Sequence, residues 1–240
     1  MGLSKEPRDC MFLKKLKFQT NLDELIPLLD QVKWDETGRC RLNNPIGHWL
    51  YDPYTISNEW KDTAFHYFLD SIPYKIGEAR LMKLEPGKCY MAHADVDNRY
   101  HLNLISNDQC YLIDLNTSTM HPIITDGILY EMDGSVIHTA VNFGAHPRVQ
   151  LVIRVPLSRY HNVTHIAKKI TVNNPPFDLR YKIDQTVSAI IGREIKQGNV
   201  SFFDPVSATE LYLQLNPATF EFIYRELKKM ELDFEVIDYD

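Results

Sequence analysis

The stretch ARLMKLEPGKCYMAHAD, residues 79–95, opens a series of eight short β-prone runs that decides the fold. Turn residues such as Pro86-Gly87 and Asp133-Gly134 separate the runs at intervals of about ten residues. Short strands at such regular spacing are typical of a β-sandwich or barrel, and eight of them fit a jelly roll. The runs are ARLMKL (79–84), CYMAHAD (89–95), YHLNLI (100–105), CYLIDL (110–115), HPIIT (121–125), GILYEM (127–132), SVIHTAV (135–141) and RVQLVIRV (148–155).

These runs define a core domain, residues 76–156, with a flank on each side. Apolar residues recur at helical spacing over residues 21–33 and 58–70. We therefore expect residues 1–75 to form an N-terminal helical flank that packs on the core. The expected fold class is mainly β with flanking helices.

Residues 157–240 predict a mixed C-terminal extension that ends in a helix. Asn216-Pro217 is a typical helix start, and apolar residues follow it at positions spaced by three and four. Residues 161–203 are hard to assign to secondary structure, and the sequence does not predict the role of this extension.

Composition restricts the class of protein. The chain has 240 residues, 44% hydrophobic and 24% charged, as expected of a globular protein rather than a disordered one. A net charge of −6 gives no electrostatic attraction to nucleic acid or to an anionic membrane, and we expect neither as a partner. No apolar run has the length of a signal peptide or a membrane span. Cys10, Cys40, Cys89 and Cys110 lack metal-binding spacing, so we expect free thiols and a cytoplasmic protein.

Three residues are candidate metal ligands. His93 and Asp95 lie two apart in a predicted strand, so their side chains share one face. His138 lies in a later apolar run, after enough intervening strands for the chain to return beside the first. Taken alone, His93 and Asp95 are typical surface residues and His138 is a typical core histidine. Together they form a 2-His-1-carboxylate set, which leaves coordination positions open and suits Fe(II) that handles a cosubstrate and O₂.

Three further residues are candidates for binding an anionic cosubstrate. Arg148 follows His138 by ten residues, at the start of the next run, and a hairpin would bring the two strands side by side. An arginine there could bind a dicarboxylate through two parallel hydrogen bonds. Arg99 and His101 share one strand face by the same two-residue rule, where they could bind a carboxylate of the cosubstrate or substrate. The alternative is that all three are exposed strand residues.

The ordered set of motifs resembles the aspartyl/asparaginyl β-hydroxylase-like 2-oxoglutarate oxygenases. The motifs are a Leu-x-Pro-Gly turn, His-x-Asp, Arg-x-His, a late His in an apolar strand, and Arg ten residues further on. The resemblance covers about residues 76–156 and implies a double-stranded β-helix, the jelly roll of these enzymes. It implies Fe(II) bound by His93, Asp95 and His138. It also implies that Arg148 binds the distal carboxylate of 2-oxoglutarate, with His101 and Arg99 as further cosubstrate-binding residues.

The resulting functional hypothesis is an Fe(II)/2-oxoglutarate-dependent dioxygenase. It would use O₂ to hydroxylate an amino acid side chain, free or in a peptide (Asp/Asn or Pro), with release of succinate and CO₂. Two alternatives remain open at this point: a non-catalytic jelly-roll binding module, and a cupin-like metal enzyme that does not use 2-oxoglutarate. The sequence does not name the substrate, the hydroxylated position or the oligomeric state.

Overall fold

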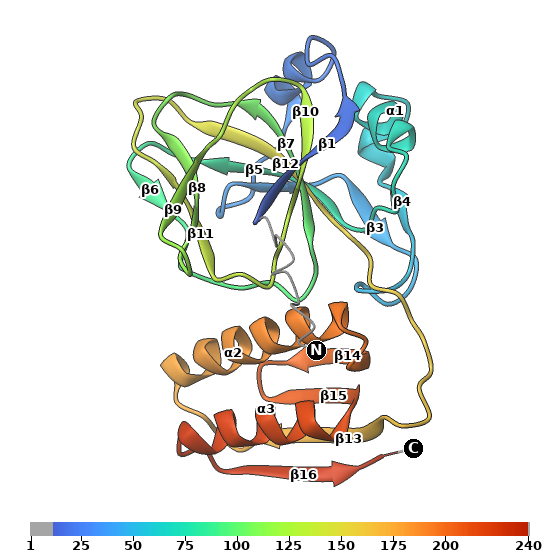
Figure 1. Ribbon diagram of the computed structural model, residues 1–240. Helices are drawn as coiled ribbons and strands as arrows, with labels where there is room; N and C mark the ends of the chain where they lie inside the picture. Colours follow the sequence, from blue (N-terminus) through green and yellow to red (C-terminus); the bar gives the residue numbers. More distant parts are fainter. Residues whose placement is uncertain (1–11, 240) are drawn as a thin grey trace, which may run out of the picture.

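The predicted runs form a barrel of two facing sheets in the computed structural model, which describes residues 12–239 (Figure 1). One sheet contains β5 (Ala79–Leu84), β7 (Arg99–Ile105), β10 (Ile128–Met132) and β12 (Arg148–Arg154). The other contains β6 (Lys88–Cys89), β8 (Cys110–Asp114), β9 (Thr119–Pro122) and β11 (His138–Asn142). The strand orders are β10-β7-β12-β5 and β6-β11-β8-β9, with antiparallel neighbours throughout. This arrangement is a jelly roll, so the predicted fold class is confirmed.

The N-terminal flank is less helical than expected. β1 (Leu13–Gln19) pairs with β10 and β2 (Arg39–Arg41) pairs with β5, so both strands extend the larger sheet to six. β3 (Asn43–Pro45) and β4 (Tyr54–Ile56) form a separate hairpin.

Both predicted N-terminal helices are shorter than the apolar pattern indicated. Within residues 21–33 only a 3₁₀ helix forms, η1 (Ile26–Gln31), with Pro27 in its first turn. Within residues 58–70 the 3₁₀ turn η2 (Asn58–Trp60) is separated from α1 (Ala64–Ser71). Asp62, between them, has a left-handed φ of 59°, which no α-helix accommodates.

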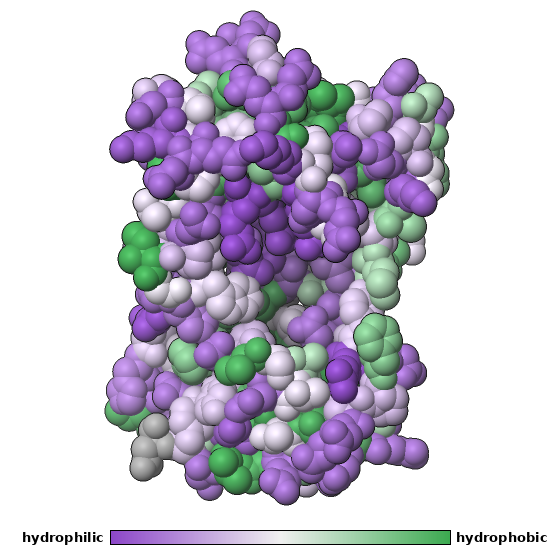
Figure 2. Space-filling view, turned by 180° about the vertical axis from the view of Figure 1, so that it is seen from behind, coloured by the Kyte–Doolittle hydropathy of each residue, from purple (hydrophilic) through white to green (hydrophobic). Residues whose placement is uncertain are grey.

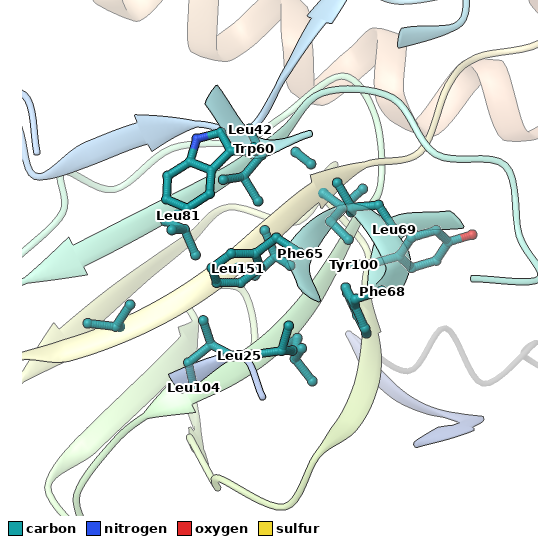
Figure 3. Packing of buried hydrophobic residues seen from close by; sticks show 14 of the residues in the cluster. Leu25, Leu42, Trp60, Phe65, Phe68, Leu69, Leu81, Tyr100, Leu104 and Leu151 are labelled. Atoms are coloured by element: carbon teal, nitrogen blue, oxygen red, sulfur yellow. The ribbon is translucent and has the colours of Figure 1, made fainter. Parts of the chain in front are cut away.

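Side chains point alternately to the two faces of each strand, so the outer and inner faces of the larger sheet carry different residues. On the outer face, Tyr100, Leu102 and Leu104 of β7 pack with Leu151 of β12 against the N-terminal flank (Figure 3). The flank contributes buried apolar side chains from η1 and the residue before it, from η2 and from α1: Leu25, Leu29, Trp60, Phe65, Phe68 and Leu69. The remaining residues of the same strands point into the barrel, where they are available to form a site.

The C-terminal extension is an α/β unit of its own. Its elements are β13 (Ile166–Val172), α2 (Phe177–Lys196), β14 (Val200–Ser207), β15 (Glu210–Leu215), α3 (Pro217–Lys229) and β16 (Phe234–Asp238). The strand order β14-β15-β13-β16, with antiparallel neighbours, is the split βαβ arrangement of ferredoxin-like folds. Asn216 caps α3 as expected, its side chain accepting from the Ala218 and Thr219 N–H groups. The expectation that the extension ends in a helix is wrong, because β16 follows α3.

Helix α2 lies between the C-terminal sheet and the barrel (Figure 1). The Tyr181 hydroxyl donates to the Ala92 carbonyl, and the Gln185 side chain accepts from the Ala94 N–H. A Cβ added at Gly192 would lie 2.8 Å from Ser135 Cβ and 3.0 Å from the Asp95 carbonyl oxygen. The helix therefore contacts both chain segments that carry the predicted metal ligands.

Two simpler expectations concern the thiols and the membrane. Cys40, Cys89 and Cys110 are free, as expected, whereas Cys10 lies outside the described residues. Between residues 12 and 239, no helix has the length and apolar composition needed to cross a membrane.

Candidate functional site

The structure brings the three predicted metal ligands together. One ligand atom from each of His93, Asp95 and His138 lies within 4.8 Å of the others. His93 and His138 form a β-bridge, in which each backbone N–H donates to the other's carbonyl at 2.9 and 2.8 Å. The expected strand over residues 89–95 is wrong in detail, because β6 ends at Cys89 and His93 is paired through an isolated bridge rather than within a strand. Backbone pairing between neighbouring segments of one sheet therefore holds two of the three groups side by side.

Both imidazoles are held in the tautomer that a metal ligand needs. Nδ1 of His93 lies 2.9 Å from the Met91 carbonyl oxygen, and Nδ1 of His138 lies 2.8 Å from that of Val136. A carbonyl only accepts, so Nδ1 carries the proton and Nε2 keeps its lone pair. Nε2 of His138 points toward Asp95, 3.9 Å from its Oδ2. Burial lowers the pKa of His138 although the Asp95 charge opposes this, so the neutral, metal-binding form is favoured.

A tight turn positions Asp95. Its backbone N–H donates to the Gly134 carbonyl at 2.6 Å. A Cβ added at Gly134 would lie 2.1 Å from the Asp97 carbonyl oxygen and 2.9 Å from Asp95 Cβ. Only glycine fits there, which explains the Asp133-Gly134 turn directly before the strand that carries His138.

Arg99 lines the cavity as expected, but its contacts there are with carboxylates of the protein. We expected it to face the cosubstrate or substrate, but its guanidinium donates to Asp95 Oδ1 at 2.8 Å and also pairs with Asp97. Burial raises the pKa of the Asp95 carboxyl, but the charges of Arg99, His138 and His93 outweigh it and hold this pKa below its ordinary value. Asp95 is therefore ionised, and Arg99 orients it.

This pairing predicts the effect of Arg99→Met. The substitution removes the arginine partner of Asp95 and leaves Asp97 with only its looser contact to Arg154, so the free energy of unfolding of the metal-free protein should fall by about 3–5 kcal/mol. Metal affinity should fall about 10- to 100-fold, because Asp95 loses the group that orients it. Urea unfolding and metal titration measure the two effects. Arg225→Met, at an exposed position on α3 that pairs with Glu221, is the control. Unchanged stability and metal affinity would contradict the positioning role.

The triad opens into a cavity of about 510 Å³ inside the barrel, and Arg148 lies in its wall. This side chain is 1% exposed, yet its Nε and Nη1 atoms have no hydrogen-bond partner in the part of the chain that the structure describes. Among the same residues, no carboxylate lies within ion-pair distance of it. Its guanidinium lies 5.8 Å from the centre of the Tyr90 ring, and the Tyr90 hydroxyl also lacks a partner. A buried cation without a counter-charge is costly, so this end of the cavity is suited to an anion.

His101 adds a second unpartnered group to this wall. It is 8% exposed, and within residues 12–239 neither ring nitrogen has a hydrogen-bond partner. Burial, followed by the charges of Arg148 and His138, lowers its pKa to about 3. A neutral imidazole has one donor and one acceptor free for a ligand. Arg148, His101 and Tyr90 thus offer the donors that a dicarboxylate such as 2-oxoglutarate requires, beside three groups that fit Fe(II).

Sequence reasoning missed several core residues of the cavity wall and the whole of the wall that comes from outside the core. The missed lining residues include Trp49, Arg80, Arg154, Tyr181, Asp184 and Gln185. A signal for α2 was present, because Ile183, Val187, Ile190 and Ile191 follow helical spacing. Asp184 and Gln185 lie next to that apolar stripe. Nothing in the sequence indicated that the helix would dock on the barrel.

The site combines two histidines, one carboxylate and a buried arginine inside a jelly roll, which is the arrangement of the 2-oxoglutarate-dependent oxygenases. Residues 63–156 match the family model "Aspartyl/Asparaginyl beta-hydroxylase". The match spans strands β5 to β12 of the barrel, and the protein is an oxygenase of the hydroxylase type. Among solved structures, the chain is similar to a viral collagen prolyl hydroxylase, vCPH, from Paramecium Bursaria Chlorella virus-1 in its 2OG complex. The identity is 12% over 61% of this chain and 98% of that one, with a TM-score of 0.38.

Proposed function

We propose that the protein hydroxylates a carbon of an amino acid side chain, in a free amino acid or in an aspartyl, asparaginyl or prolyl residue of a peptide. It would use Fe(II), O₂ and 2-oxoglutarate and release succinate and CO₂. The observation that carries this proposal is the cluster of His93, Asp95 and His138 in one cavity with the buried Arg148, which has no ion-pair partner among residues 12–239.

Each residue of the cluster has a role that its contacts support. His93 and His138, through Nε2, and Asp95 would hold Fe(II), which when bound supplies the O₂ and C–H chemistry of this class. Arg99 and the Gly134 turn hold Asp95 in place. Arg148 would donate to the distal carboxylate of 2-oxoglutarate, while His101 and Tyr90 supply further hydrogen bonds. Helix α2 covers the mouth of the barrel and limits the entry of water.

The two alternative functions explain less. A cupin-like metal enzyme without 2-oxoglutarate would leave Arg148 as a buried cation with no ligand. A non-catalytic binding module would not need two histidines that each have Nδ1 fixed by a carbonyl. The hydroxylase family match of the barrel also disfavours the module.

A titration of 2-oxoglutarate into the metal-loaded protein tests the proposal. With Mn(II) in place of Fe(II), we expect saturable binding that is much weaker for glutarate, which lacks the keto group. With Fe(II) and ascorbate, we expect slow succinate release without substrate, and EDTA should stop it. Free amino acids and short Asp-, Asn- and Pro-containing peptides are then screened for faster release. Metal-loaded protein that binds no 2-oxoglutarate would refute the proposal and favour the cupin-like alternative.

A further inference from the structure

Strand β12 carries arginines that point into the cavity at both of its ends. Arg148 and Arg154 are an even number of residues apart, so they share the inner face of the sheet, and both line the cavity. Six residues of strand separate their Cα atoms by roughly 20 Å. A five-carbon dicarboxylate is much shorter than that, so 2-oxoglutarate bound at Arg148 leaves the Arg154 end free for a second ligand.

The Arg154 end carries excess positive charge. The Arg154 side chain is only 12% exposed, lies 4.1 Å above the Trp49 ring, and pairs loosely with Glu78 at 3.4 Å and Asp97 at 3.5 Å. Its Nε and Nη1 atoms have no hydrogen-bond partner within residues 12–239. The same two carboxylates serve four guanidinium groups, Arg41, Arg80, Arg99 and Arg154, of which only Arg99 has a further carboxylate partner among the described residues, Asp95. Arg80 and Arg154 can therefore accept one more carboxylate.

An unpaired carboxylate lies on the wall that α2 provides. Asp184 lines the cavity beside Asp95 and His93 and is half-buried. Burial, followed by the Asp95 charge, raises the pKa of Asp184. No described lysine or arginine lies within ion-pair distance of it, and Gln185 is its hydrogen-bond partner at 3.0 Å. A positively charged group of the substrate would give the Asp184 carboxylate the counter-charge that it lacks among the described residues.

We propose that this cavity recognises a free α-amino acid, whose carboxylate binds Arg80 and Arg154 and whose ammonium group binds Asp184. The inference rests on the proposed function and names its substrate class. A residue inside a peptide has neither an α-carboxylate nor an α-ammonium group, so it would satisfy neither end. Figure 2 shows the molecule hollowed where the barrel meets the C-terminal unit, with hydrophilic residues gathered on the barrel side. Both units thus form the amino acid site, with Asp184 contributed by the C-terminal one.

The test compares free and blocked amino acids with the holoenzyme. Each common L-amino acid, its N-acetyl derivative and its N-acetyl amide is added to protein saturated with Fe(II) and 2-oxoglutarate, and succinate release is measured. Binding to the Mn(II)-loaded protein is followed in parallel by calorimetry. We expect at least one free amino acid to bind and to stimulate turnover, and its blocked forms to bind on the order of ten- to a hundredfold more weakly.

Substitutions at Arg154 and Asp184 test the expected contacts with the carboxylate and the ammonium group of the amino acid. Arg154→Gln and Asp184→Asn should each raise KM for the amino acid on the order of tenfold, with little change in KM for 2-oxoglutarate. Asp184→Asn should also reduce the discrimination against the N-acetyl derivative, which a merely structural role would not do. Asp178→Asn, exposed on the first turn of the same helix, and Arg225→Gln on α3 are the matched controls.

The outcomes separate this inference from the proposed function. Blocked amino acids or peptides that bind as well as free ones would overturn it, as would failure of every free amino acid to bind. In both cases, succinate release that requires metal and 2-oxoglutarate would leave the proposed function intact. Loss of 2-oxoglutarate binding itself would refute both.

Discussion

Replacing His93 and His138 together by alanine is expected to abolish iron binding and 2-oxoglutarate turnover. The two imidazoles supply two of the three ligand atoms that lie within 4.8 Å of one another. Asp95 alone is a single carboxylate that already pairs with Arg99 at 2.8 Å. One oxygen ligand of this kind does not hold Fe(II) against water, so the loss should be complete rather than partial. Anaerobic Fe(II) titration and succinate release measure the two effects.

The fold should survive this double substitution. The β-bridge between the two residues uses backbone groups only, and these are unchanged in alanine. The metal-free variant should therefore unfold within about 1–2 kcal/mol of the wild type. His161→Ala, at an exposed position in the linker to the C-terminal unit, is the matched control and should keep full activity. Unchanged iron affinity in the double variant would refute the ligand assignment.

The strands of the core could be predicted because each one follows from the residue pattern of a short, continuous stretch of sequence. Runs of alternating character between turns such as Asp133-Gly134 correspond to β5 through β12, with boundaries shifted by a few residues. The convergence of His93 and His138 followed from strand order once a jelly roll was assumed. The irregular backbone around His93 did not follow, because a single bridge leaves the same alternating pattern as a full strand.

The function of Arg99 could not be read from its strand position. The two-residue rule correctly placed Arg99 and His101 on the inner face, where both line the cavity. It could not tell which charges face Arg99 there, because Asp95 and Asp97 reach it from the preceding loop. For the same reason, the sequence does not show that α2 docks on the barrel. The spacing of Ile183 and Val187 indicates a helix, but only contacts in the folded structure, such as the close approach of Gly192 to Ser135, show what α2 packs against.

We expect Arg148 to be required for 2-oxoglutarate binding and, at the same time, to lower the stability of the ligand-free protein. Arg148→Met should weaken 2-oxoglutarate binding roughly 10²- to 10³-fold, about 3–4 kcal/mol, because the distal carboxylate loses a buried, charged donor pair. Iron affinity should not change, since no contact joins Arg148 to the triad among the described residues. Arg148→Lys keeps the charge but loses the planar pair of donors, so its affinity should lie between those of the wild type and the methionine variant. Calorimetry with the Mn(II)-loaded proteins measures all three.

The same substitution should stabilise the ligand-free protein. The guanidinium is 1% exposed, with two nitrogen atoms unpartnered in the described part of the chain, so folding buries a charge without compensation. Methionine fills similar space without that penalty, and the free energy of unfolding should rise by about 1–4 kcal/mol. A structural arginine would behave in the opposite way, because its loss would leave partners unsatisfied. Urea unfolding without 2-oxoglutarate therefore separates the two roles. A destabilised Arg148→Met variant that still binds 2-oxoglutarate normally would show that this arginine serves the fold, and the cosubstrate site would have to lie elsewhere.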